Sequence, residues 1–330
     1  MLKYILKRIG MSILILLGVS MIIYFLIRLM PVDFIQDKIN AINQGGATVS
    51  QETQDAMYAT YGLGDNSFMG ILKGYFGWLG KLCTLDLGIS FKYGIPVSEV
   101  IFDHMGISFI IALIATVFEF LIAIPLGITA ATHQYKFRDY LVTILVMIGI
   151  SLPAFFFGQV LKELLAYQLG WFEPSGLVDA TSSFTGFNLL IDYAKHCFIP
   201  ILTIVILSIG PRMRMTRANM LEVMNSDYIR TARAKGLKES KVVNKHAFRN
   251  TLIPMVTSLA GLLPSLFSGA IITEQVFDLP GIGNMALNAM NAGDIPFIMG
   301  YNMFLALLSV IGVLLADLMY GLVDPRVKLE

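Results

Sequence analysis

Hydrophobic and polar positions divide the chain into long apolar runs separated by charged segments. The first run, 9–29, follows a short basic tail and has the length of about 20 residues that crosses a bilayer as a helix. Five further runs lie at 108–131, 140–168, 196–217, 251–273 and 296–320. This pattern predicts an all-α membrane protein with six transmembrane helices, the first within residues 1–30 and the other five within a core of residues 108–330.

The segment 31–107 is too polar to cross a membrane, because it carries eight acidic residues among short apolar pieces and glycines. We expect it to form a small extracytoplasmic subdomain between helices 1 and 2. A cleaved signal peptide is the competing interpretation of the first apolar run. That run is longer than a signal-peptide core, and Pro31-Val32-Asp33 after it lacks the small residues of a cleavage site, so a spanning helix is favoured.

The distribution of Lys and Arg orients these helices. Seventeen of the 24 basic residues fall in the start of the chain, in 132–139, in 212–249 and at the end. Five fall in the longer segments that connect the predicted helices on the opposite side of the membrane. Because basic residues accumulate on the cytoplasmic side of membrane proteins, both termini and the segment 225–250 are predicted to be cytoplasmic.

Composition and motifs exclude several classes of function. A hydrophobic fraction of 56% and a net charge of +1 give no support for a nucleic-acid partner. The sequence holds no phosphate-binding GxxxxGK[ST] loop, and its four histidines are scattered, so we expect neither ATP hydrolysis nor a bound metal. Cys83 and Cys197 lack the spacing of a redox or zinc motif; they are either incidental thiols or a disulfide pair on the outer side.

Three acidic residues, Glu119, Glu163 and Asp317, lie in or near predicted spans. A carboxylate inside a membrane is costly and is therefore a functional candidate, which raises the hypothesis of a proton-coupled transporter. Only Glu119 lies deep in its run. The alternative is that these carboxylates are hydrogen-bonded within the helix bundle and serve packing.

The predicted fifth span carries small residues at every fourth position. These are Thr257, Gly261, Ser265 and Gly269, which would share one face of a continuous helix. Such a face lets helix backbones approach closely. It serves either packing within the chain or a seam and pathway shared with a second subunit; Glu119 is a further candidate for that pathway.

The segment 225–250 is the longest basic interruption in the second half of the chain. Asn225, Ser226 and Asp227 are residue types whose side-chain oxygens cap the start of a helix. Gly236 can take the left-handed conformation that ends one. We therefore predict a short helix over 226–235 and a second one from near Glu239. Two short helices between two spans would form a rigid surface for a cytoplasmic partner.

The residues of this segment resemble those of a known family. The sequence DYIRTARAKGL at 227–237, followed by HAFRN at 246–250, is similar to the cytoplasmic loop of permeases of ATP-binding-cassette importers, specifically the first permease of the oligopeptide, dipeptide and nickel group. The motifs LDLGIS at 85–90, SLPAF at 151–155, PGIG at 280–283 and DPR at 324–326 resemble the same group. The general pattern of such loops, Glu-Ala-Ala and a later Gly, is replaced here by Arg230, Thr231 and Ala232 with Gly236.

This resemblance implies a type I importer permease fold in a prokaryotic cell membrane and no catalytic residue in this chain. It assigns the helix that contacts the ATPase to ten residues: Ser226, Asp227, Tyr228, Arg230, Thr231, Ala232, Arg233, Ala234, Lys235 and Gly236. The implied partners are a homologous second permease, two ATPase subunits that hold ATP and magnesium, and an extracytoplasmic solute-binding protein that docks on 31–107 and 274–295. The implied substrate is a peptide, with nickel, a metallophore or glutathione as the alternative.

Overall fold

The structure, a computed structural model, describes residues 2–28, 39, 40, 43, 50, 51, 58, 67–179, 184–258 and 261–323. In this part of the chain the regular structure is helical, apart from a single antiparallel bridge between Ile89 and Pro96. The chain forms two compact units, one of Met1–His104 with Met285–Val310 and one of Met105–Asn284 with Ile311–Leu329. The all-α prediction is confirmed.

The first unit contains α1 (Leu2–Arg28), α4 (Phe68–Cys83), the start of α5 (Val97–Thr132), most of α14 (Ile282–Asn291) and the first half of α15 (Ile295–Val323). The loop between α4 and α5 is fixed to the start of α15 by Asp294, whose carboxylate accepts hydrogen bonds from the Ser90 hydroxyl and, at 3.1 Å, from the Lys92 amide. The same carboxylate caps α15 by accepting from the Phe297 amide at 3.1 Å.

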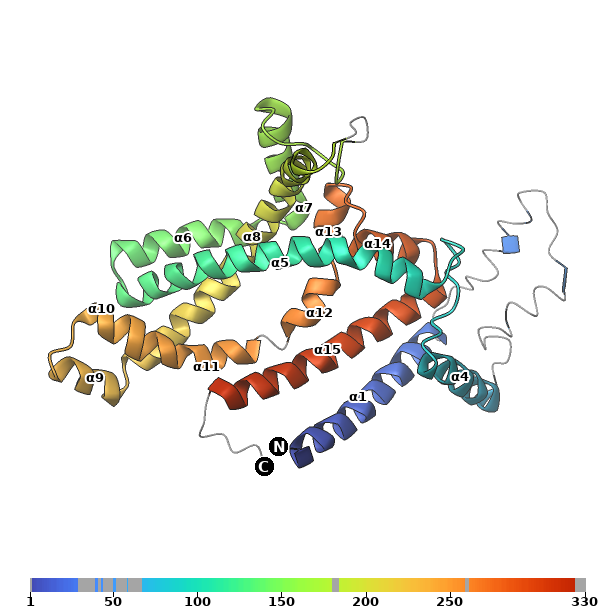
Figure 1. Cartoon of the computed structure of the whole chain (residues 1–330), viewed down its shortest axis with the longest axis horizontal. Coiled ribbons are helices and arrows are strands. Elements are labelled where there is room, and N and C mark those ends of the chain that lie inside the picture. Colours follow the sequence, from blue (N-terminus) through green and yellow to red (C-terminus); the bar gives the residue numbers. More distant parts are fainter. Residues whose placement is uncertain are drawn as a thin grey trace. The chain divides into compact units, whose positions relative to one another are not determined.

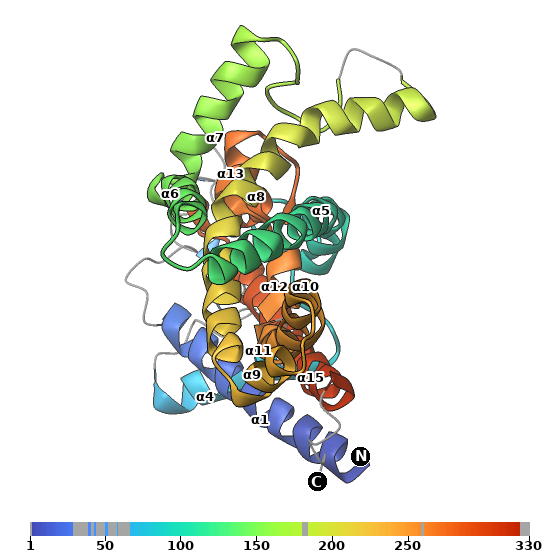
Figure 2. The same cartoon turned by 90° about the vertical axis from the view of Figure 1, so that its left-hand side faces the viewer.

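The second unit contains the remaining helices. They are the rest of α5, α6 (Phe137–Ser151), α7 (Ala154–Lys162), the π-helix η1 (Glu163–Gln168), α8 (Phe187–Met224), α9 (Asp227–Ala234), α10 (Glu239–Lys241), the π-helix η2 (Val242–Ala247), α11 (Phe248–Ser258), α12 (Leu262–Phe267), α13 (Ile271–Val276), the start of α14 and the second half of α15. Glycines allow close packing on α8: a Cβ at Gly127 of α5 would lie 2.6 Å from the Cβ of Thr216. Figures 1 and 2 show α9, α10 and α11 together at the C-terminal end of α8.

Four helices among the described residues are long and apolar enough to cross a membrane. These segments are Leu6–Arg28, Val97–Thr132, Phe187–Met224 and Ile295–Met319. They correspond to predicted spans one, two, four and six, although α5 starts at Val97 instead of Ser108 and α8 starts at Phe187 instead of His196.

The predicted span 140–168 is not one straight helix. Its two halves, Phe137–Ser151 and Ala154–Gln168, meet at an angle of 97°. Leu152 between them has extended φ and ψ of −97° and 138°, and Pro153 starts the second half. A residue before proline is pushed out of the helical region because the proline ring crowds its backbone. The break therefore follows from the Leu-Pro pair.

The predicted span 251–273 is also interrupted. It consists of α11, α12 and the start of α13, and the structure describes residues up to 258 and again from 261. Gly269 between α12 and α13 has a φ of +70°, which ends the helix because a right-handed helix requires negative φ. The expectation of one continuous helix over 251–273 is thus corrected.

Candidate functional site

The start of α9 departs from the predicted cap. Ser226 occupies the N-cap position with an extended backbone (φ −73°, ψ 153°), and its carbonyl accepts from the Ile229 amide at 3.1 Å. Its hydroxyl, however, donates to the Val223 carbonyl at 2.6 Å and caps no amide of α9. The hydroxyl turns back because Val223, in the last turn of α8, has a carbonyl within reach. Asp227 in the first turn still complements the positive end of the helix dipole.

The end of α9 follows the prediction. Gly236 has a φ of +74°, its amide donates to the Arg233 carbonyl at 2.9 Å, and the Leu237 amide donates to the Ala232 carbonyl at 3.4 Å. These two hydrogen bonds and the left-handed glycine form a Schellman motif, in which otherwise unpaired carbonyls at the helix end are satisfied. The left-handed stop at Gly236 is confirmed.

One face of α9 is buried against the ends of several other helices. Ile229 is fully buried and Ala232 is 7% exposed. Their core cluster also contains Ala131 of α5, Met220 of α8, and Val242, Val243 and Ala247 of η2. Because interiors are close-packed, α9 cannot shift without moving these partners. The helix is therefore a rigid extension of α5, α8 and the start of α11.

The opposite face of α9 is exposed and mostly polar. The exposed members of the predicted set are Asp227, Tyr228, Arg230, Thr231, Arg233, Ala234, Lys235 and Gly236. Of the other two, Ser226 is half-buried and Ala232 belongs to the buried face. Tyr228 presents a large ring with 48% exposure, and the cations of Arg230 and Lys235 are exposed as well. A basic face with an aromatic ring suits contact with another protein.

An ion pair braces α9 against α10. The Arg233 guanidinium donates to the Glu239 carboxylate, at 2.7 Å from Nη2 and 3.2 Å from Nε. This hydrogen bond is the main cause that lowers the pKa of the Glu239 carboxyl below its ordinary value, and the charge of Arg233 adds to it. The pair fixes the turn that contains Gly236 and keeps the exposed face of α9 in one orientation.

Glu119, the deep carboxylate of the predicted pathway set, forms an ion pair. Its Oε1 accepts from Nε of Arg212 at 2.9 Å, and the two side chains join α5 to α8. The Arg212 guanidinium also lies over the Phe120 ring, 4.4 Å from its centroid. Glu119 is 8% exposed, so the pairing supplies the partner that a buried charge requires.

The small-residue set does not form one helix face. Gly261 precedes α12 as its N-cap, Ser265 lies within α12, and Gly269 lies in the break before α13. The backbone of Thr257 belongs to α11, whereas its side chain lies outside the described residues. Because the left-handed Gly269 interrupts the helix after Ser265, the period of four residues does not place the whole set in one row.

A buried carboxylate, expected from the sequence only as part of a loop, organises this region. Glu274 is 2% exposed and accepts hydrogen bonds from the Ser108 hydroxyl at 2.7 Å, the Ala270 amide at 3.1 Å and the Asn284 amide at 3.0 Å. Three glycines make room for it: Gly269, Gly281 and Gly283. A Cβ at Gly269 would lie 2.6 Å from Glu274 Oε1. In the sequence, the glycines of the PGIG motif were the signal from which this buried carboxylate could have been found.

A second pair that was not predicted holds the start of α6. Arg217 of α8 donates to both carboxylate oxygens of Asp139, each at 2.8 Å, and the Tyr135 amide donates to the same carboxylate at 3.0 Å. Asp139 is 4% exposed. The sequence indicates no partner for Asp139, because Arg217 follows 78 residues later.

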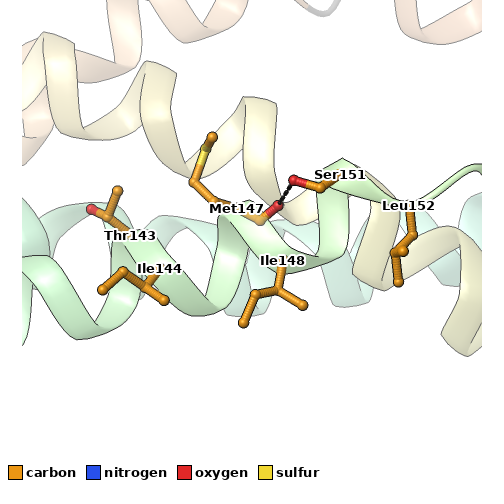
Figure 3. A pocket seen from close by; sticks show the side chains of 6 residues that line it. All are labelled: Thr143, Ile144, Met147, Ile148, Ser151 and Leu152. Atoms are coloured by element: carbon orange, nitrogen blue, oxygen red, sulfur yellow. Dashed lines mark hydrogen bonds between the residues drawn. The ribbon is translucent and has the colours of Figure 1, made fainter.

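A shallow hollow of 350 Å³ runs along α6, lined by Thr143, Ile144, Met147, Ile148, Ser151 and Leu152 (Figure 3). The Ser151 hydroxyl donates to the Met147 carbonyl at 2.7 Å, as Figure 3 shows. The lining of the hollow is mainly aliphatic, which offers little to hold a polar ligand. Among the described residues no three His, Cys, Asp or Glu side chains are grouped for a metal ion, and both cysteines are free.

Known proteins resemble this chain over its full length. The oligopeptide transport system permease protein AppB of Bacillus subtilis (strain 168) is 36% identical over 329 residues, covering 99% of this chain and 100% of that protein. The dipeptide transport system permease protein DppB of Escherichia coli (strain K12) is 31% identical over 345 residues, covering 99% of each.

Among solved structures, the inward-facing MetNI methionine ABC transporter matches with a TM-score of 0.51 at 15% identity, over 69% of this chain and 97% of that one. At this identity the match concerns the fold alone, and it agrees with the predicted importer permease fold. Residues 123–329 match a family of membrane components directly. The chain belongs to the family of binding-protein-dependent transport system inner membrane components.

Proposed function

We propose that this chain is one permease subunit of an ATP-driven peptide importer and that α9 couples it to a separate ATPase. The peptide substrate is supported by the relatives, whose names assign them to oligopeptide and dipeptide transport. The chain would form half of the translocation pathway, and a homologous second permease the other half. Two ATPase subunits would bind ATP and magnesium, and an extracytoplasmic solute-binding protein would deliver the peptide at the surface of a prokaryotic cell membrane.

The observation that carries this proposal is the two-sided character of α9. Its buried residues Ile229 and Ala232 join it to the ends of α5 and α8, while its exposed basic face is open to a partner. A partner that changes shape on binding and hydrolysing ATP would move α9 as a rigid body. Because packed cores have discrete arrangements, that movement would repack the spanning helices and open the pathway to alternate sides.

Replacement of residues 226–236 by a flexible Gly-Ser linker of equal length tests the coupling. We expect the purified complex to lose peptide uptake into proteoliposomes, because a linker transmits no displacement. Substitution Lys136→Ala, at an exposed position in the turn between α5 and α6 and outside the segment 225–250, is the control and should leave uptake unchanged. Retained uptake with the linker would contradict the assignment.

The substrate class needs its own experiment. The reconstituted complex with its solute-binding protein is offered peptides of different lengths, nickel, a nickel chelate and glutathione. We expect uptake of peptides and stimulation of ATP hydrolysis by peptides. Uptake of nickel or glutathione without peptide uptake would retain the importer mechanism and refute the substrate.

A further inference from the structure

Helix α4 is bonded to the membrane-crossing part of α1. The Tyr75 hydroxyl lies 2.9 Å from the Ser20 hydroxyl in a buried hydrogen bond. Tyr24, which is 2% exposed, contacts two aromatic residues of α4: its ring centroid lies 5.6 Å from that of Tyr75 and 6.0 Å from that of Trp78. Both views show α4 beside the C-terminal part of α1 (Figures 1 and 2).

This contact sets the depth of α4. Ser20 lies eight residues before the end of α1 at Arg28, which is about 12 Å along a helix that rises about 1.5 Å per residue. Tyr24 lies roughly half as far from that end. The cluster that joins the two helices also contains Ile295 and Met299, in the first turns of α15. Since α1 and α15 both cross the membrane, α4 lies against the outer ends of two spans and at membrane depth.

The side chains of α4 divide into three sectors around the helix. Ile71, Tyr75, Trp78 and Leu79 face α1 and α15. At about 100° per residue, the next sector holds Met69, Leu72 and Phe76, of which Met69 is 73% and Phe76 is 63% exposed. The remaining sector holds Lys73 and Lys81, both exposed, and the glycines Gly70, Gly74 and Gly77.

We propose that α4 is embedded in the outer leaflet of the membrane and that its partner is lipid. Met69 and Phe76 contact acyl chains, and Lys73 and Lys81 reach the headgroup phosphates. With 16 residues α4 is about 24 Å long, too short to cross a hydrocarbon core of about 30 Å, which is typical of a helix lying at the interface. The predicted outer segment 31–107 is accordingly not wholly in water.

Two alternative occupants of the exposed apolar sector are the solute-binding protein and the second permease. The depth set by Ser20 and Tyr24 favours lipid over a protein that approaches from water. The order of the sectors around α4 also favours lipid, because the apolar sector lies between the side facing α1 and the side that carries the lysines. An amphipathic helix at a membrane surface has this arrangement.

Spin labelling of the assembled complex in proteoliposomes tests the proposal. In a background with Cys83→Ser and Cys197→Ser, a nitroxide is attached at Phe76→Cys and, as the matched control one turn away, at Lys73→Cys. We expect the label at position 76 to collide mainly with oxygen, which concentrates in lipid, and the label at position 73 mainly with a water-soluble nickel chelate. A charged maleimide should react about tenfold more slowly with the thiol introduced at position 76 than with the one at position 73, because a thiol in apolar surroundings forms little thiolate.

Two results would overturn the lipid assignment. Equal access of the nickel chelate to both positions would place the sector in water, open to the solute-binding protein. Protection of position 76 from both oxygen and the chelate would show a protein partner, the second permease. Met69→Cys repeats the measurement in the same sector if the Phe76 variant does not assemble.

Discussion

Three glycines in the second unit show two different physical reasons for a glycine: a left-handed backbone and a lack of space for a side chain. Gly261 has a helical φ of −81° with open space around it, and Gly236 has a φ of +74° with open space. Gly269 has a φ of +70°, and a Cβ added there would meet Glu274 Oε1 at 2.6 Å. Gly261 therefore needs neither a left-handed backbone nor the absence of a side chain. Gly236 needs only the left-handed backbone, and Gly269 needs both the left-handed backbone and the space that a side chain would fill.

Alanine substitutions at these three glycines should therefore give graded effects on the free energy of unfolding. Gly261→Ala should change it by less than about 0.5 kcal/mol. Gly236→Ala should lower it by about 1 kcal/mol, the backbone cost of a left-handed residue. Gly269→Ala should lower it by roughly 3 kcal/mol, because the methyl group also displaces Glu274. Thermal and chemical unfolding in lipid nanodiscs measure the series; equal effects at 236 and 269 would refute the steric part.

The hydrogen bonds of Glu274 predict that even glutamine, the amide of the same size, is a poor replacement. Its two oxygens accept from the Ala270 and Asn284 amides and from the Ser108 hydroxyl, so a Gln side chain would bring an NH₂ group against at least one donor. We expect Glu274→Gln to lower the free energy of unfolding by about 2 kcal/mol, the cost of a buried donor without an acceptor. Glu163→Gln, at an exposed carboxylate, is the control and should have little effect.

At the scale of single elements, α9 could be predicted closely because local signals define it. Asp227 at its start and Gly236 at its end act through the backbone within a few residues. The path of the segment 251–273 could not be predicted in the same way. Hydropathy measures the average over a window, whereas the break at Gly269 depends on Glu274 and on Ser108, which lies 166 residues from Glu274 in the sequence.

The break within predicted span three had a local signal in the sequence, the Leu-Pro pair, but the continuous hydropathy of the run predicts a single span. Pro153 forces Leu152 out of the helical region, and the halves diverge by 97° although the composition of 140–168 is continuous in apolar character. The buried ion pairs were harder to predict from the sequence. Asp139 and Glu119 were visible as acids, but their partners follow 78 and 93 residues later, beyond the range of any periodic pattern.

The brace between α9 and α10 predicts a pH effect on this element. The pKa of the Glu239 carboxyl is lower in the folded chain than in the unfolded one, so its stabilisation is full above the ordinary carboxyl pKa and is lost as the pH falls through the lowered value. Because Arg233 and Glu239 are 40% and 58% exposed, the effect should stay below about 1 kcal/mol and shrink with salt.

Hydrogen exchange of the α9 amides measures this effect. At neutral pH and low salt, protection in the wild-type chain should exceed that in Glu239→Gln, and the difference should disappear in acid once Glu239 is protonated. Glu222→Gln, at an exposed position of α8, should match the wild-type chain throughout. A difference that persists at acid pH would mean that the carboxylate charge is not what braces α9.

At the scale of the whole molecule, the decisive question is which energy source drives transport. A proton-coupled carrier needs a carboxylate that takes up and releases a proton during the cycle. Glu119 was the candidate for that role, and it is bound to Arg212 at 2.9 Å with 8% exposure. The geometry suits a fixed link between α5 and α8.

Glu119→Gln should therefore retain ATP-driven peptide uptake when the proton gradient is collapsed by an ionophore, since no step of the cycle moves a proton through this side chain. Arg212→Met should be more damaging, because it leaves a buried carboxylate without its cation, and the double variant should recover part of that loss. A double-mutant cycle on the free energy of unfolding should give a coupling of roughly 1–3 kcal/mol. If uptake in Glu119→Gln were lost while folding and assembly stayed intact, and if wild-type uptake followed the proton gradient, the carrier mechanism would replace the ATP-driven one.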